Sequence, residues 1–446
     1  MQPGSESAIL QENRRTFLQT SSMALLALAV PGTVAARPHP TESLAMLGGP
    51  KAVSFPSDKF EALTRWPRYG QAEKDALHRL IDNDKFYEEL PLFEKEWQEY
   101  TGIPYLRAHM NGSSAITSMY FAIDLEPGSE VMLPSYNFFS DCLAMRFFNY
   151  VPIFVDIDPA NACFNLEDAR RKFTSRTRAV FPMHSWGQPC EMDHIRDFAK
   201  DKGLLVLEDA AHAHGASMQG KKMGTWGDLA IFSFQASKAL PAVEGGMGMY
   251  HSRLHYERAA AFGEYSLPEK LPAESPVHRY AGTGFGQKYR MHPFAAAVGR
   301  MQLRTLDATS AQVENNVRRL NNSLIQLTGL CEPHCRSDQK RAYYYRNMLL
   351  LDSAKAGFSR DALVKALQAE GVHVSTWIYP EQHKLAIYSE SKWWHHPPVI
   401  PSSMPGNDYI NGQHIFLPLM YDQADDLIDQ YVKAFQKVWS HRAQLA

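Results

Sequence analysis

The sequence predicts an α/β fold in which helices cover both faces of a mostly parallel sheet. The first observation is that short apolar runs alternate with helical patterns through the first two thirds of the chain. The second is that these runs are apolar along most of their length, as strands are when a sheet is covered on both faces. The apolar runs lie at residues 131–133, 151–157, 178–184, 204–209 and 229–235, with helical patterns among them at 140–148 and 166–173.

The final third predicts a smaller α+β unit. Its β-like runs lie at 346–351 and 372–376, and helical patterns lie at 360–371 and 425–438. A chain of 446 residues is long enough for two or three structural units. We expect an N-terminal segment over residues 1–36, a larger domain over 37–295 that begins with an extended arm up to Pro67, and a smaller domain over 296–446.

Composition excludes several classes of protein. Hydrophobic residues make up 45 % of the chain, which is enough for a sizeable core. The formal net charge of −2 gives no basis for nucleic-acid binding. Beyond the N-terminal segment the sequence has no apolar stretch long enough to predict a membrane span.

The first 36 residues have the three parts of an export signal in order. Arg14 and Arg15 precede an apolar run at residues 23–30, and small residues follow up to Ala36. The paired arginines, with phenylalanine two places on, resemble a twin-arginine signal. We therefore expect export, to the periplasm, with cleavage after Ala36; the alternative is a cytoplasmic protein with an apolar N-terminus.

The five cysteines do not suggest a disulfide-built fold, because their number is odd and low. Cys331 and Cys335 lie close enough in sequence to pair in an oxidising compartment, or they remain two free thiols. A metal site at His184, Glu191 and His194 is less favoured than solvated helix residues, so no metal is expected.

Two of the predicted strands end in residues that carry chemistry. The run at 204–209 ends in Asp209, and the run at 229–235 is followed by Lys238. Ligands of open α/β sheets bind at the carboxyl ends of the strands, so both side chains are candidates for one pocket. Pyridoxal phosphate (PLP) needs a lysine amine for its aldehyde and a carboxylate for its pyridine nitrogen. Asp209 and Lys238 are therefore the candidate catalytic residues.

A second candidate feature is the stretch Asn111-Gly112-Ser113-Ser114, between a short strand-like run and a helical pattern. Small residues at a helix start leave backbone N–H groups free to bind a phosphate. From the residues alone, an ordinary capped helix is the favoured interpretation, since serine is a favoured cap. A phosphate seat is the alternative.

Longer motifs resemble the DegT/StrS family of PLP-dependent sugar aminotransferases. The matching text is EDAAHAHGA, GKKMGTWGDLAIFSF, the lysine of FQASK and EGG, together with the H-x-x-G-x-P pattern that begins at His184. The resemblance runs from about residue 45 to the end of the chain. It implies a type I PLP fold and a homodimer whose active sites lie at the interface.

The resemblance also implies roles for individual residues. Gly112, Ser113 and Ser114 correspond to a phosphate-binding motif, and Ser233 to a further phosphate ligand. Phe138 is placed on the pyridine ring, and His212 near the ring hydroxyl. Lys288 lies in a segment that reaches the neighbouring site, where an ammonium would meet the phosphate as a point charge. The candidate cofactor-binding residues are thus Gly112, Ser113, Ser114, Phe138, Asp209, His212, Ser233, Lys238 and Lys288.

The function implied by the resemblance is transfer of an amino group from glutamate or glutamine to a keto-sugar or keto-cyclitol. KYRMHP and LAMLGGPKAV are similar to the branch that aminates cyclitols such as scyllo-inosose. One alternative is PLP-dependent sugar dehydration, although related dehydratases have histidine where this chain has Lys238. The other is an exported, non-catalytic binding or sensory protein on the same scaffold, which the intact Asp209, Ser233 and Lys238 argue against. Trp186, Tyr379 and His383 are candidate contacts for the substrate because of their positions in loops.

Overall fold

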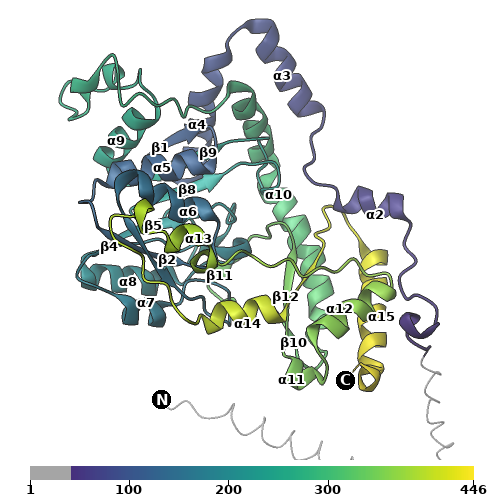
Figure 1. Cartoon of the computed structure of the whole chain (residues 1–446). Coiled ribbons are helices and arrows are strands. Elements are labelled where there is room, and N and C mark those ends of the chain that lie inside the picture. Colours follow the sequence, from purple (N-terminus) through teal and green to yellow (C-terminus); the bar gives the residue numbers. More distant parts are fainter. Residues whose placement is uncertain (1–41, 446) are drawn as a thin grey trace, which may run out of the picture. The chain divides into compact units, whose positions relative to one another are not determined.

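A computed structural model describes residues 42–445 of the chain, so the export segment expected at 1–36 lies outside the described residues. A seven-stranded sheet has the order β1-β9-β8-β5-β4-β2-β3 (Figure 1). Within this sheet β9 runs antiparallel to both of its neighbours and the other strands run in one direction, which confirms a mostly parallel sheet. The strands are β1 (Tyr105–His109), β2 (Glu130–Pro134), β3 (Val151–Val155), β4 (Thr177–Val180), β5 (Leu205–Asp209), β8 (Leu229–Ser233) and β9 (Gly246–Tyr250).

Alternate side chains of the central strands enter two different hydrophobic clusters. Leu207 and Ile231 pack with α5 on one face of the sheet, whereas Val206 and Phe232 join the cluster on the other face. Because both faces are buried, β5 and β8 read as short apolar runs rather than as alternating ones. The surrounding helices are α4 (Glu89–Thr101), α5 (Gly112–Ile123), α6 (Phe139–Leu143), α7 (Leu166–Lys172), α8 (Met192–Lys202) and α9 (Arg253–Gly263).

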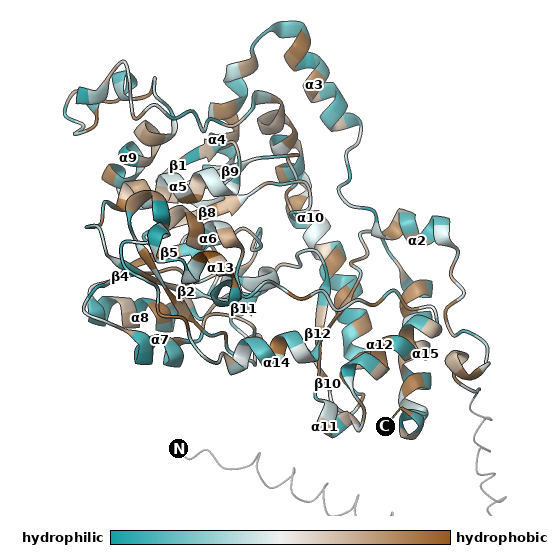
Figure 2. Cartoon of the chain, in the orientation of Figure 1, coloured by the Kyte–Doolittle hydropathy of each residue, from teal (hydrophilic) through white to brown (hydrophobic). Residues whose placement is uncertain are grey.

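A second, three-stranded antiparallel sheet has the order β10-β12-β13. With its helices it forms the α+β part of the fold. Its elements are β10 (Leu330–Cys331), β12 (Asn347–Leu351), α11 (Ser353–Ala356), α12 (Arg360–Ala369), α14 (Pro405–Gln413), β13 (His414–Leu417) and α15 (Asp425–Ser440). The buried residues of α15 recur at three- and four-residue spacing, and Figure 2 shows both apolar and hydrophilic residues along this helix.

One long helix, α10 (Pro293–Leu324), belongs to the cores of both sheets. Its first half packs against α3 (Gln71–Asn83) and α4, with Ala296 buried in the cluster beneath the large sheet. Its second half packs against α15, where Leu320 and Leu324 join the cluster beneath the small sheet. Pro293 at the first helical position, with His292 as the N-cap, fixes where the helix begins.

The structure corrects three expectations about local structure. The arm is not extended throughout, because it contains a short 3₁₀ turn at Ala45–Leu47 and α2 (Ser57–Thr64). The single helix expected at 140–148 is divided into α6 and a 3₁₀ segment at Ala144–Phe148. The β-like run at 372–376 makes one isolated bridge, from Ser375 to Phe416, and β13 occupies the sheet position instead. Strand pairing is non-local, so the pattern of one run does not decide which run enters a sheet.

Glu370 at the end of α12 holds the N-terminal arm in place. Its side chain is fully buried and accepts hydrogen bonds from the backbone N–H groups of Ala45 (2.7 Å) and Ala52 (2.9 Å). It also pairs with Lys437 of α15, with 2.9 Å between Nζ and Oε2. Lys437 in turn donates to the carbonyl of Pro50 at 2.6 Å. Both charged groups are thus fully engaged, which is the condition for burying an ion pair.

Among the helices of residues 42–445, none combines the length and the apolar character that crossing a membrane requires.

Candidate active site

The carboxyl ends of β5 and β8 and the N-terminus of α5 meet around one cavity of about 590 Å³. Asp209 ends β5, Ser233 ends β8, and Lys238 follows in the loop that leads to β9. This is the edge of a parallel sheet at which ligands bind. The cavity is lined by Asn111, Gly112, Ser113, Ile116, Phe138, Asp141, Trp186, Asp209, Ala211, His212, Ile231, Ser233, Gln235, Lys238, Glu244, Tyr344, Tyr345, Trp377 and Tyr379.

The start of α5 lies close to the end of β8. A Cβ atom on Gly112 would lie 3.0 Å from the Ser233 Cβ, so a larger residue there would require Ser233 to shift by a few tenths of an ångström. The Asn111 side chain caps the helix by accepting from the backbone N–H of Ser114 at 2.8 Å. The first backbone N–H groups of α5 remain available to an anion, and the cavity has hydroxyl groups of Ser113 and Ser233 beside them.

Seven of the nine predicted cofactor-binding residues line the cavity, and two do not. The two exceptions are Ser114 and Lys288. The Ser114 hydroxyl donates to the carbonyl of Asn111 at 2.8 Å, so it serves the helix cap rather than the cavity. Lys288 is exposed and lies outside the cavity of its own chain, in the segment that follows α9 (Figure 1).

The environment of Lys238 makes its amine easier to deprotonate. Burial lowers the pKa of Lys238 to about 8, although the charge of Asp209 acts in the opposite direction. Its Nζ lies 4.4 Å from the centre of the Tyr344 ring. A lysine with a lowered pKa supplies an uncharged amine, which is the form that attacks a carbonyl carbon.

Asp209 and His212 are both buried at the end of β5. Asp209 accepts a hydrogen bond from the backbone N–H of Ala211 at 2.8 Å, which fixes the orientation of the carboxylate. Burial, together with the charge of Lys238, holds the pKa of His212 well below its usual value, so the imidazole is neutral. The His212 ring stacks on Tyr344 with 4.0 Å between ring centres, and its Nδ1 atom has no hydrogen-bond partner in residues 42–445.

Aromatic side chains form part of the cavity wall. Trp186 stacks on Tyr344 and meets Trp377 and Tyr379 edge to face, with 5.5–6.1 Å between ring centres. Of the three predicted substrate contacts, Trp186 and Tyr379 line the cavity. His383 does not, because it is buried against Ser135, with 2.6 Å between its Nδ1 and the Ser135 Oγ.

Sequence reasoning missed Asp141, Tyr344 and Trp377. Asp141 lies in the first turn of α6, where an acidic residue is common because it complements the helix dipole. Tyr344 and Trp377 come from the α+β part of the chain, so their approach to the large sheet depends on tertiary packing. The spacing of Asn137 and Asp141, one helical turn apart, was the available signal for Asp141.

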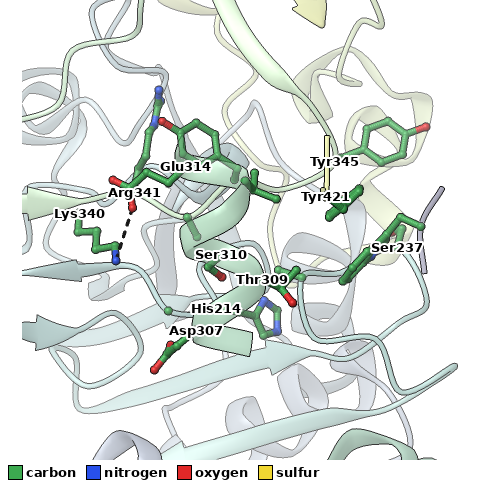
Figure 3. A pocket seen from close by; sticks show the side chains of 16 residues that line it. His214, Ser237, Asp307, Thr309, Ser310, Glu314, Lys340, Arg341, Tyr345 and Tyr421 are labelled. Carbon is green, nitrogen blue, oxygen red and sulfur yellow. Dashed lines mark ion pairs between the residues drawn. The ribbon is translucent and has the colours of Figure 1, made fainter. Parts of the chain in front are cut away.

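A second cavity of about 40 Å³ shares Tyr345 with the first (Figure 3). Lys340 and Glu314 form an ion pair at its edge, with 3.5 Å between charged atoms. A volume of this size holds a few water molecules and no larger ligand. The larger cavity is therefore the candidate active site.

His184 and the cysteines take structural positions. His184 is buried against Glu208, with 3.0 Å between Nε2 and Oε2, whereas His194 is exposed beside Glu191. Over residues 42–445 no three His, Cys, Asp or Glu side chains come together as a metal site. All five cysteines are free thiols, Cys331 and Cys335 among them.

The residues present fit PLP. The lysine is partly buried and has a lowered pKa, the carboxylate is held in one orientation, and the helix N-terminus provides an anion seat. Two buried polar atoms, His212 Nδ1 and Asp141 Oδ1, have no hydrogen-bond partner within the described chain. Both are therefore available to bind a ligand or a proton. On this fold, such a donor set places the chain among the type I PLP-dependent enzymes.

Comparison with known sequences gives the family. The profile of the DegT/DnrJ/EryC1/StrS aminotransferase family matches residues 67–436, and the chain belongs to this family. Its members are PLP-dependent aminotransferases, and this protein is one of them.

Individual relatives and solved structures agree with this placement. GDP-perosamine synthase of Escherichia coli O157:H7 is 30 % identical over 309 residues, which are 68 % of this chain and 80 % of that protein. A putative L-glutamine:3-amino-2,3-dideoxy-scyllo-inosose aminotransferase of Streptomyces kanamyceticus is 28 % identical over 391 residues, covering 85 % of this chain and 88 % of that one. The structure of an aminotransferase from Psychrobacter cryohalolentis has a TM-score of 0.77 at 23 % identity, covers 85 % of this chain and 100 % of that one, and has the same fold.

Proposed function

We propose that this protein transfers an amino group from glutamate or glutamine to a keto-sugar or keto-cyclitol. The observation that carries the proposal is that Lys238 and Asp209 line one cavity with a helix N-terminus. Relatives named for perosamine synthesis and for a scyllo-inosose derivative support an acceptor of this class.

PLP, when bound, supplies an aldehyde that condenses with amines and a ring that withdraws electrons from the carbon bearing the amino group. The residues that would hold it are Ser113, Ser233 and the N-terminus of α5 at the phosphate, and Asp209 at the ring nitrogen. The Nζ atom of Lys238 takes and returns a proton, which its pKa of about 8 allows near neutral pH. The neutral His212 and the Tyr344 ring keep water from one side of this amine.

The walls of the cavity favour an uncharged acceptor. Trp186, Trp377 and Tyr379 offer apolar faces to a sugar or cyclitol ring. Lys238 is the single lysine or arginine among the described residues that line the cavity. A keto-cyclitol carries no phosphate and so needs no further cation, whereas a nucleotide-linked sugar needs a cation from outside this cavity.

The proposal is tested by following the visible absorption of PLP bound to the mature protein. Glutamate or glutamine is expected to bleach this absorption, and a keto-cyclitol such as scyllo-inosose is expected to restore it. A matched arm replaces the cyclitol with a nucleotide-linked keto-sugar. Release of a deoxygenated product without any donor would show dehydration instead, and no absorption change with any donor or acceptor would favour a non-catalytic binding protein.

The proposed enzyme is a homodimer in which Lys288 serves the neighbouring site. Lys288 is exposed and does not line the cavity of its own chain, and its backbone pairs with Glu264 in a bridge that fixes the segment. An exposed lysine held in this way is available to the phosphate bound by a second copy of the chain.

Mixing two defective variants tests the dimer. Lys238→Ala and Lys288→Ala are each expected to have low activity, since one lacks the amine and the other the proposed phosphate contact. Reassociated in equal amounts, they should recover about a quarter of wild-type activity, because half of the dimers then contain one complete site of two. If the activity of the mixture equals the average of the two variants, Lys288 does not act across the interface.

We also propose that the protein is exported to the periplasm through the twin-arginine route, on the basis of Arg14, Arg15 and the apolar run that follows. Replacing both arginines with lysine in the full chain is expected to shift the protein from the periplasmic to the cytoplasmic fraction. An unchanged distribution between the fractions would count against this route. A variant with Arg65→Lys, outside the signal, serves as the control.

A further inference from the structure

A second carboxyl group, that of Asp141, lies beside Asp209 and has no role in the mechanism described so far. Asp141 is 1 % exposed and lines the cavity with Asp209. Its Oδ2 accepts a hydrogen bond from the Asn137 side chain at 2.8 Å, and its backbone carbonyl accepts from the Tyr120 hydroxyl at 2.7 Å. Both contacts hold the carboxyl group in one place.

The Oδ1 atom of Asp141 is buried and has no hydrogen-bond donor within residues 42–445. Asp141 and Asp209 line the same cavity, and the carboxyl group of Asp209 raises the pKa of Asp141. Two neighbouring carboxylates repel one another, and burial strengthens the repulsion. A proton on Asp141 removes the repulsion and turns the unpartnered carboxyl into a donor toward Asp209.

The surroundings assign the proton to Asp141 rather than to Asp209. Asp209 accepts a hydrogen bond from the backbone N–H of Ala211, which stabilises a negative charge on Asp209, whereas the Oδ1 atom of Asp141 has no donor within residues 42–445. Burial, and then the charge of Asp209, raises the pKa of Asp141 well above its usual value. The other titratable groups that face Asp141 are Lys238, Tyr120, Cys142, Tyr379 and Tyr388.

We propose that Asp141 is a positioning residue that stays protonated at neutral pH and donates a hydrogen bond to the Asp209 carboxylate. The pair then presents one negative charge, in a fixed orientation, to the ring nitrogen of PLP. A second negative charge at this place would favour the ammonium form of Lys238 and reduce the supply of its neutral amine. This inference rests on PLP binding at Asp209, but its first test does not.

The first test measures the stability of the PLP-free protein against pH by chemical denaturation, for the wild type and Asp141→Asn. A carboxyl group that keeps its proton in the folded state and loses it in the unfolded state makes folding take up one proton. The ratio of folded to unfolded protein should therefore fall for the wild type, relative to Asp141→Asn, by about tenfold per pH unit. This fall begins near pH 4 and ends where Asp141 ionises in the folded state. Asparagine is neutral at every pH and retains a donor, so its curve lacks this slope.

Parallel stability curves for the two proteins would overturn the proposal, because Asp141 would then have the same charge in the folded and unfolded states. Glu244→Gln is the matched control. It removes a carboxylate that also lines the cavity, but this carboxylate is exposed and makes no contact with Asp209. Its curve should run parallel to that of the wild type. If Asp141→Asn does not fold, Asp141→Ser, which also places a neutral donor there, takes its place.

The second test measures PLP affinity at pH 7.5. Asp141→Asn should bind PLP within about threefold of the wild type, whereas Asp141→Ala, which removes the donor, should bind at least about tenfold more weakly. Equal losses in both variants would overturn the proposal. The stability curves could diverge as expected while neither the wild type nor any variant binds PLP. That result would support a protonated Asp141 and contradict the proposed function.

Discussion

Replacing Lys238 with alanine is expected to abolish the visible absorption of bound PLP and to lower the rate of amino transfer by about 10³-fold or more. The variant loses both the amine that attaches the cofactor and the group that moves the proton. Lys238→Arg should be equally inactive, because an arginine side chain keeps its proton at every accessible pH. The measurements are the absorption spectrum with added PLP and the rate of keto-acid formation from glutamate or glutamine.

Lys340→Ala provides the control for this prediction. Lys340 lies at the edge of the small second cavity, pairs with Glu314 and makes no contact with the larger one. Its replacement should change the rate by no more than about twofold. Persistent absorption in both Lys238 variants would mean that a different amine holds PLP, and the assignment of the active-site lysine would be wrong.

Replacing Glu370 with alanine is expected to lower the free energy of unfolding by about 3–5 kcal/mol. The change leaves Lys437 buried without its partner and removes the acceptor for the backbone N–H groups of Ala45 and Ala52. Glu370→Gln retains the acceptor oxygen but not the charge, so its loss should be smaller. Chemical denaturation measures each value, and limited proteolysis should show that the arm before residue 53 becomes susceptible first.

The pair formed by Lys95 and Glu99 supplies the comparison for Glu370. Both side chains are exposed and their charged atoms are 3.9 Å apart on successive turns of α4. Glu99→Ala should cost no more than about 0.5 kcal/mol, because exposed pairs of this kind contribute little. If the two substitutions have similar effects, the arm is not held by Glu370.

The parts of the site that could be predicted are those for which a local sequence pattern and a general structural rule are sufficient. Asp209 and Lys238 follow apolar runs, and the rule that ligands bind at strand ends is enough to bring them together. Gly112 was predicted as part of a phosphate seat, and the structure adds a steric reason, since its Cα lies against Ser233. The helices α12 and α15 were predicted from the helical patterns at 360–371 and 425–438.

The parts that could not be predicted depend on contacts between distant segments. Tyr344 and Trp377 reach the cavity only because the α+β part of the chain packs there, and nothing in their local sequence indicates it. Trp186 has a φ of 55°, in a region that tryptophan rarely occupies, which turns its ring toward Tyr344. Asp141 lies in the first turn of α6, where an acidic residue has an ordinary explanation, so its place in the sequence does not single it out.

The continuity of α10 determines how the chain comes apart. A single run from Pro293 to Leu324 supplies buried side chains to the core beneath each sheet, with no break between Ala296 and Leu324 where one core could separate from the other. Unfolding of either core would expose the apolar side chains of one half of α10 to water. We therefore expect loss of one core to destabilise the other through α10, so that amide protons on the two halves of α10 exchange with similar free energies of opening.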